Sequence, residues 1–177
     1  WDKSDNALEF ADNAKAIFGA GSDLSIYHNG TNSIIGDTGA GELSLQSNGT
    51  GIRLWNSADR ETLLNAANNG AVDLYHNNVK TFATIGNGVS VIGPEGGNAE
   101  IEIFSDEGDD NADKYKLVVD GSVFYLQNYA SGGWESNLKA VGDGTVELFY
   151  DNDRKFKTLS TGAQVESATG DCHFYVH

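Results

Sequence analysis

GAVDLYHNNVKTFATIGNGVSV (residues 70–91) decides the fold of this chain, because GTVELFYDNDRKFKTLSTGAQV (residues 144–165) repeats it 74 positions later. Eight of the 22 paired positions are identical, and most of the others keep their chemical character. A weaker third copy, LSIYHNG (residues 24–30), aligns with VDLYHNN (residues 72–78). Such repetition predicts a modular, extended protein whose units bury their apolar faces against neighbours.

Each of the two long copies reads as a β-hairpin followed by a short strand. Apolar and polar residues alternate on both sides of Asn77-Asn78, and again on both sides of Asp151-Asn152-Asp153. Alternation with a period of two is typical of strands, and Asn and Asp favour the turn between them. Since no window of helical length keeps a convincing apolar face, we predict an all-β fold, an elongated array of hairpin repeats.

Other local signals extend this interpretation. Asn29-Gly30 fits the two-residue type I′ turn of a further hairpin, and residues 42–46 (ELSLQ) read as a further strand. Residues 7–18 and 60–68 are rich in Ala and Leu, which favour helix. We expect strands there, with residues 7–18 folded as a hairpin, and helix is the alternative.

Composition divides the chain into three segments. Residues 1–93 are predicted to be a β-hairpin repeat region, and residues 142–177 a hairpin repeat with a C-terminal strand. Residues 94–141 differ from the repeats and are predicted to be an inserted β module that contains an acidic loop, SDEGDDNAD.

The charge balance excludes several classes of partner. The 177 residues include 11 Lys and Arg against 26 Asp and Glu, a formal net charge of −15. An acidic surface repels nucleic-acid phosphates and anionic lipid headgroups, so we expect no nucleic-acid and no membrane partner. Cys172 is the only cysteine, which excludes an intrachain disulfide. The absence of Met, including at position 1, predicts a fragment or a processed product.

The acidic loop is the candidate metal site. Asp109, Asn111 and Asp113 follow the D-x-N-x-D spacing of an EF-hand calcium loop, and Asp120 falls at its twelfth position. Lys114 replaces the glycine that the sharp turn of that loop requires, and the residues after it read as a strand. The alternative is a solvated turn between two antiparallel strands that binds no metal. Calcium at this loop is the one candidate cofactor, and we expect no other.

Catalytic motifs are missing from the sequence, whereas aromatic residues suggest a binding surface. No G-x-S-x-G elbow, P-loop or H-E-x-x-H sequence occurs, so we expect no enzyme. Aromatic side chains near Gly-, Asn- and Ser-rich turns can stack on sugar rings while amides and carboxylates bind hydroxyl groups. Packing in a core or a subunit interface is the alternative. The candidate glycan-binding residues are Trp134, Tyr129, Tyr125 and Trp55.

Several long phrases resemble the repeat modules of tail-fibre and other virion appendage proteins of marine bacteriophages, including cyanophages. They are DKSDNALEFADNAKAIFGAGSDLSIYHNGTNS, GAVDLYHNN, GTVELFYDNDRKFKTLSTG and DEGDDNADKYKLVVDGSVFYLQNYASGGWESNL, and they cover most of the chain. The resemblance implies an extracellular, virion-borne, β-rich homotrimer that supports host attachment and contacts other appendage proteins and host-surface glycans.

The repeats are consistent with such an assembly, because a hairpin with one narrow apolar face is marginal alone. Three copies packed around an axis would bury that face continuously. We therefore expect a non-enzymatic structural module. Two alternatives are a lectin-like receptor-recognition module of the same appendage and a subunit of a bacterial surface filament or adhesin. The residues expected in the intermolecular core are Val72, Leu74, Phe82, Val146, Leu148 and Phe156.

Overall fold

The computed structural model describes residues 3–167, which contain fifteen β-strands and two short 3-10 helices. The strands form three antiparallel sheets, so the prediction of an all-β fold is confirmed. The chain divides into two units between Ser47 and Asn48. Within the described residues, no helix has the length and apolar character needed to cross a membrane.

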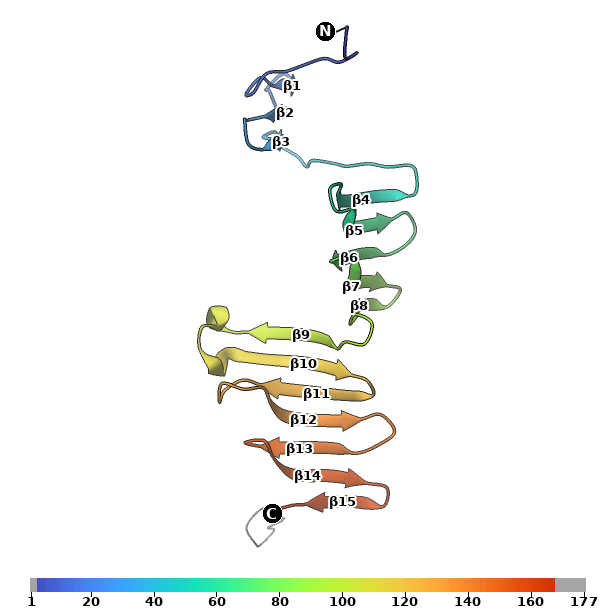
Figure 1. Cartoon of the computed structure of the whole chain (residues 1–177), viewed down its shortest axis with the longest axis vertical. Helices are drawn as coiled ribbons and strands as arrows, with labels where there is room; N and C mark the ends of the chain where they lie inside the picture. The colour runs from blue at the N-terminus through green and yellow to red at the C-terminus, as the bar shows by residue number, and fades with distance from the viewer. Residues whose placement is uncertain (1–2, 168–177) are drawn as a thin grey trace. The chain divides into compact units, whose positions relative to one another are not determined.

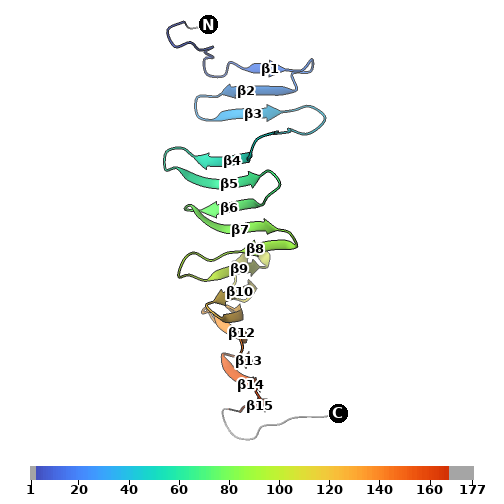
Figure 2. The same ribbon diagram turned by 90° about the vertical axis from the view of Figure 1, so that its right-hand side faces the viewer.

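The first unit holds one three-stranded sheet (Figure 2). β1 pairs with β2, with Ala16 opposite Ile26, and residues 8–10 form no strand, so the hairpin expected within residues 7–18 is wrong. A strand forms only where a neighbouring strand pairs with it. Residues 16–18 have that partner in β2 and do not pair with residues 8–10. The strands are β1 (Ala16–Phe18), β2 (Leu24–His28) and β3 (Ser33–Asp37).

The turn between β2 and β3 is wider than predicted. His28 faces Ser33, so the loop has four residues and is no two-residue type I′ turn. The side-chain oxygen of Asn29 accepts hydrogen bonds from the N–H groups of Thr31 and Asn32, at 3.0 Å and 2.7 Å. This local bonding satisfies the amides of the wider loop and explains why it forms.

The second unit begins with a five-stranded sheet in chain order (Figure 2). Residues 60–68 contribute β5, as expected, and not a helix. Residues 42–46, which precede this sheet, form no strand. That prediction is wrong, because alternation alone makes no strand where no neighbouring strand pairs with it. The strands are β4 (Gly51–Asn56), β5 (Glu61–Ala67), β6 (Val72–His76), β7 (Val79–Ile85) and β8 (Gly88–Val91).

A seven-stranded antiparallel sheet follows (Figure 1). It includes residues on both sides of position 141, since Leu138 pairs with Leu148; the division of the chain at 93 and 141 stays a prediction. The strands are β9 (Ala99–Phe104), β10 (Lys114–Asp120), β11 (Val123–Asn128), β12 (Glu135–Val141), β13 (Val146–Tyr150), β14 (Asp153–Leu159) and β15 (Gly162–Val165). The loop between β9 and β10 contains η1 (Asp106–Gly108) and η2 (Asn111–Asp113).

The predicted turns of the two long repeats are two residues long. Asn77 and Asn78 have φ of 51° and 62°, and Asp151 and Asn152 have φ of 52° and 60°. A type I′ turn requires positive φ at both central residues, and Asn and Asp tolerate that conformation better than other side chains. Asp153, which was expected in the second turn, is already the first residue of β14.

Strand register places the same residue types opposite one another in both sheets of the second unit. Directly paired residues project from the same side of a sheet. One row across β4–β8 reads Leu54, Leu64, Leu74, Phe82 and Val91. The corresponding row across β11–β15 reads Leu126, Leu138, Leu148, Phe156 and Val165. We call the side of each sheet that carries this row its apolar face, and the opposite side its polar face.

The buried residues of the described chain lie on the polar faces. Val118 and Ala83 are each 4% exposed and Glu147 is 8% exposed, whereas Leu54 and Leu148 on the apolar faces are 53% and 44% exposed. The assignment to faces follows from register, because a single row contains Val118, Tyr125, Lys139, Glu147 and Lys157. Long polar side chains therefore cover their own face, while the apolar faces stay bare.

Candidate functional site

The six residues predicted to form the intermolecular core all lie on the apolar faces. Val72 and Leu74 are each 40% exposed, Val146 is 37% exposed and Leu148 is 44% exposed. Phe82 and Phe156 are half-buried. Removing apolar surface from water is favourable by about 25 cal/mol for each Å². Burial of these exposed faces against a partner would therefore stabilise an assembly.

The polar face of β12–β15 carries a connected set of ion pairs. Arg154 lies 3.0 Å from Glu147 and forms two hydrogen bonds with Glu166, at 3.1 Å from Nε and 3.0 Å from Nη2. Lys139 lies 3.8 Å from Glu147, and Lys157 lies 3.4 Å from Glu166. Two carboxylates, Glu147 in β13 and Glu166 directly after β15, are thus held by three cations from β12 and β14.

These contacts shift the ionisation of two groups. The hydrogen bonds from Arg154 lower the pKa of Glu166 from its ordinary value, and Lys157 adds a smaller effect in the same direction. The hydrogen bond to Glu166 is also the main cause of a raised pKa for Arg154. Both groups therefore stay charged over a wider pH range than usual.

Two of the candidate glycan-binding residues contact each other. Tyr129 and Trp134 lie at the ends of the β11–β12 loop, with ring centroids 5.1 Å apart in an edge-to-face arrangement. The Nζ atom of Lys116 lies 4.5 Å from the Trp134 centroid and 3.1 Å from Glu100, and that of Lys114 lies 5.7 Å from the Tyr129 centroid. Because a lysine occupies one face of each ring, a sugar could stack only on the other face.

The other two candidate aromatic residues lie elsewhere. Tyr125 projects from the polar face of β11, next to Val118 and Lys139 in the same row. Trp55 belongs to β4 in the other sheet of the unit and is 46% exposed. The four aromatic residues therefore form one pair and two separate positions, not a single platform, and their role in glycan binding stays a prediction.

Trp55 lies beside a polar hollow that sequence reasoning missed. The guanidinium carbon of Arg53 is 4.9 Å from the centroid of the Trp55 ring. A hollow of about 500 Å³ opens at this place on the polar face of the five-stranded sheet. The alternation Arg-Leu-Trp indicated that Arg53 and Trp55 share a face, but Asn65 joins them only through strand pairing. The residues that line the hollow are Thr50, Gly51, Arg53, Asn65 and Ala67.

The acidic loop brings together a set of carboxylates that only partly matches the predicted one. Carboxylate oxygens of Asp109 and Asp113 lie within 4.8 Å of each other and of Asp106, which was not predicted. Ser105 Oγ donates a hydrogen bond to Asp113 at 2.9 Å, so part of this set is engaged within the loop. Asn111 begins η2 in the same loop. Calcium binding stays a prediction here.

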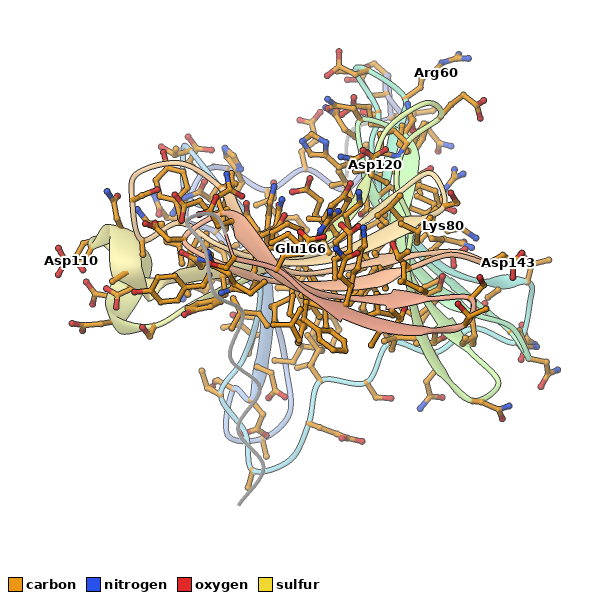
Figure 3. The ribbon with its side chains drawn as sticks, turned by 90° about the horizontal axis from the view of Figure 1, so that it is seen from below. Arg60, Lys80, Asp110, Asp120, Asp143 and Glu166 are labelled. Atoms are coloured by element: carbon orange, nitrogen blue, oxygen red, sulfur yellow. The ribbon has the colours of Figure 1, made fainter. Side chains whose placement is uncertain are left out.

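The acidic loop and the hairpin turns occupy different ends of the strands in the seven-stranded sheet. Figure 3 shows Asp110 in the acidic loop at one end and Asp143 of the β12–β13 turn at the other. The loop end also holds the Tyr129 and Trp134 pair, because the carbonyl of Lys114 at the start of β10 accepts a hydrogen bond from the N–H of Tyr129 at 3.0 Å. Acidic and aromatic groups are therefore neighbours at this end of the sheet.

Comparisons with known proteins add no further assignment. No protein-family model matches the chain, and searches of curated proteins and of solved structures found no match.

Proposed function

We propose that this chain is a non-enzymatic structural module of a phage tail fibre or related virion appendage, which is extracellular and supports host-cell attachment. In this proposal three copies pack their apolar faces together around an axis, and the polar faces point outward. Contacts with other appendage proteins would continue the fibre. Two things support this proposal: the resemblance of the sequence to phage appendage proteins, and the exposure of the apolar faces, which is the structural observation on which it rests.

That exposure is unusual for a monomeric protein. Soluble monomers rarely leave large contiguous apolar patches in water, and larger ones mark interaction surfaces. Ala83 and Val118 are the only buried hydrophobic residues among positions 3–167, and neither lies on an apolar face. A single-layer sheet with one bare apolar face needs a second layer to be stable. Further copies of the same chain are the simplest source of that layer, because both sheets of the second unit present the same row of residue types.

Light scattering coupled to size exclusion tests this function on the native chain. Since one chain has a mass of 18.9 kDa, the proposal predicts a particle of three times that mass. A compact monomer would contradict it, because the apolar faces would then have to be closed within one chain.

A second function, glycan recognition by the same appendage, is supported by the Tyr129 and Trp134 pair next to the acidic loop. A glycan array with and without EDTA separates the two functions. A purely structural module binds no glycan in either condition, whereas a calcium-dependent lectin loses binding when EDTA removes the metal. Trp134→Ala should reduce binding if the aromatic pair forms the site.

A further inference from the structure

The hollow on the polar face of the five-stranded sheet has the composition of a ligand site. Arg53 and Asn65 face each other across the β4–β5 ladder, as do Gly51 and Ala67, so all four project from one side. A side chain at position 51 would collide with the carbonyl oxygen of Ala66, and Gly51 has φ of 151°. Glycine is therefore required there, and together with Ala67 it leaves the floor of the hollow free of bulky side chains.

The polar side chains around the hollow form no ion pair and no hydrogen bond with other residues among positions 3–167; the Thr50 carbonyl accepts one from the N–H of Asn68 at 2.9 Å. Among the described residues, no carboxylate lies within ion-pair distance of Arg53, and no hydrogen bond involves its guanidinium. The amide of Asn65 and the hydroxyl of Thr50 likewise have no side-chain hydrogen bond in this part of the chain. Arg53 and Arg60 are the two arginines without a carboxylate partner among residues 3–167, and of these only Arg53 lines a hollow together with an amide and a hydroxyl group.

The contact with the Trp55 ring restricts the Arg53 side chain and so favours ligand binding. A guanidinium stacked on an aromatic ring loses side-chain freedom, while its N–H donors stay free at the edge of the plane. Those donors match the two oxygens of a carboxylate or sulfate group. The nearest charged neighbour in the row is Asp73, whose side chain is 13% exposed and lies 3.6 Å from Lys80. Lys80 offsets this charge only in part, because the buried Oδ1 atom of Asp73 has no hydrogen-bond partner among the described residues.

The corresponding position of the seven-stranded sheet lacks this feature. Tyr125 and Lys139 replace Arg53 and Asn65 in the polar-face row. Lys139 lies 3.8 Å from Glu147, so its charge is used in an intrachain ion pair. An unpaired arginine that lines a hollow is thus found in β4 and not at the corresponding position of the seven-stranded sheet.

We propose that the hollow binds a sugar unit that carries an oxyanion, a carboxylate or a sulfate. Arg53 receives the oxyanion, and Asn65 and Thr50 bind hydroxyl groups of the ring. The exposed face of Trp55 lies beside the ring. This inference rests on the glycan-recognition function proposed above and adds to it a second site, separate from the Tyr129 and Trp134 pair, with its own ligand class.

Calorimetric titration of the full chain tests the site with three sugars of one scaffold: galacturonate, galactose 6-sulfate and galactose. At least one of the two anionic sugars should bind about tenfold or more tightly than galactose, because a hydrogen bond to a charged group contributes about 1.5–3 kcal/mol. The comparison between the two anionic sugars distinguishes a carboxylate ligand from a sulfate ligand. Added salt should weaken the binding of either.

Variants locate the binding. Arg53→Gln should remove the preference for the anionic sugar, and Arg53→Lys should weaken it because lysine lacks the paired donors. Arg60→Gln is the matched control, since Arg60 lies in the turn before β5 (Figure 3) and is not among the residues that line the hollow. Equal binding of galactose and both anionic sugars, absence of binding, or unchanged binding by both Arg53 variants would overturn the inference.

Particle mass, titration with anionic sugars and the glycan array together test this inference separately from the function on which it rests. Particle mass reports the packing of the apolar faces, whereas the hollow lies on the polar face of one sheet. A trimer that binds no anionic sugar contradicts the hollow site alone. A glycan array that detects neutral glycans only, lost in Trp134→Ala, keeps glycan recognition and overturns the anionic site.

Discussion

Arg154 donates a hydrogen bond from Nη1 to Oε1 of Glu147 at 3.0 Å, and Glu147 is the only charged side chain that is buried among residues 3–167. The pair lies on the polar face, opposite the bare Leu148. Its counterpart in the five-stranded sheet, Lys80 with Asp73, is longer at 3.6 Å. The polar face of β12–β15 is therefore more tightly connected than that of β4–β8.

Removing Arg154 should destabilise the fold. Arg154→Gln removes the ion pairs with both Glu147 and Glu166 and leaves the buried Glu147 with Lys139 alone as its cation. A buried carboxylate that loses its partner pays a desolvation penalty. We expect a lower Tm near neutral pH, measured by circular dichroism. Lys155→Gln is the control, because Lys155 pairs with the exposed Asp153, and a fall in Tm of equal size would contradict the prediction.

The same network predicts a loss of stability in acid. Because the pKa of Glu166 is lower in the folded chain than in the unfolded chain, the unfolded state takes up a proton first as pH falls. The stabilising effect is complete above the ordinary glutamate pKa and disappears as pH falls through the lowered value. Tm measured across this acidic range should fall less steeply for Glu166→Gln than for the native chain. Parallel curves would show that Glu166 contributes nothing.

Charge placed on the apolar face should prevent assembly. Leu74→Asp and Leu148→Asp each put a carboxylate where the copies are proposed to pack, and burial of an unpaired charge is strongly unfavourable. We expect both variants to have the mass of one chain in light scattering. Gln164→Asp adds the same charge to the polar face of β15, where the side chain is exposed, and should assemble normally. Normal assembly of both leucine variants would contradict the proposed packing.

Substitutions at turn residues with positive φ should change the free energy of unfolding. Asn152 has φ of 60°, so Asn152→Val should lower the free energy of unfolding by about 1–2 kcal/mol, and Asn152→Gly should cost little. Asn78 also has positive φ, but its side-chain oxygen accepts a hydrogen bond from the N–H of Thr62 at 2.9 Å. Asn78→Gly should therefore cost about 1 kcal/mol. Chemical denaturation distinguishes these cases, and a similar effect of glycine at both positions would contradict the contribution of the Thr62 contact.

Much of the fold was predictable because its signals are local. Alternation of Val72, Leu74 and their polar neighbours predicts both the strand and the side that is apolar. The Asn77-Asn78 turn follows from the conformations that asparagine tolerates. The failures have a common cause: residues 42–46 alternate as a strand should, but a strand also requires a partner that local sequence does not reveal.

The candidate sites were less predictable because they combine distant residues. Arg53 and Asn65 meet through the β4–β5 register, and a bulge between Leu54 and Trp55 alters that register within the same strand. Asp106 joins Asp109 and Asp113 because the loop between β9 and β10 contains two helical turns, not the extended EF-hand loop suggested by the spacing. Sequence spacing records neither the bulge nor the turns.

The sequence by itself determined that the chain is all-β, where its two longest repeats turn, and which side chains of each strand share a face. These properties depend on a period of two residues and on the φ preferences of single residues, and both are written locally along the chain. Only the tertiary structure decided that Leu-Leu-Leu-Phe-Val rows align across two sheets, that the buried residues lie on the polar faces, and that Arg53 has no carboxylate partner among residues 3–167. Those properties depend on which strands pair and in what register, and hydrogen bonds between distant segments set that register.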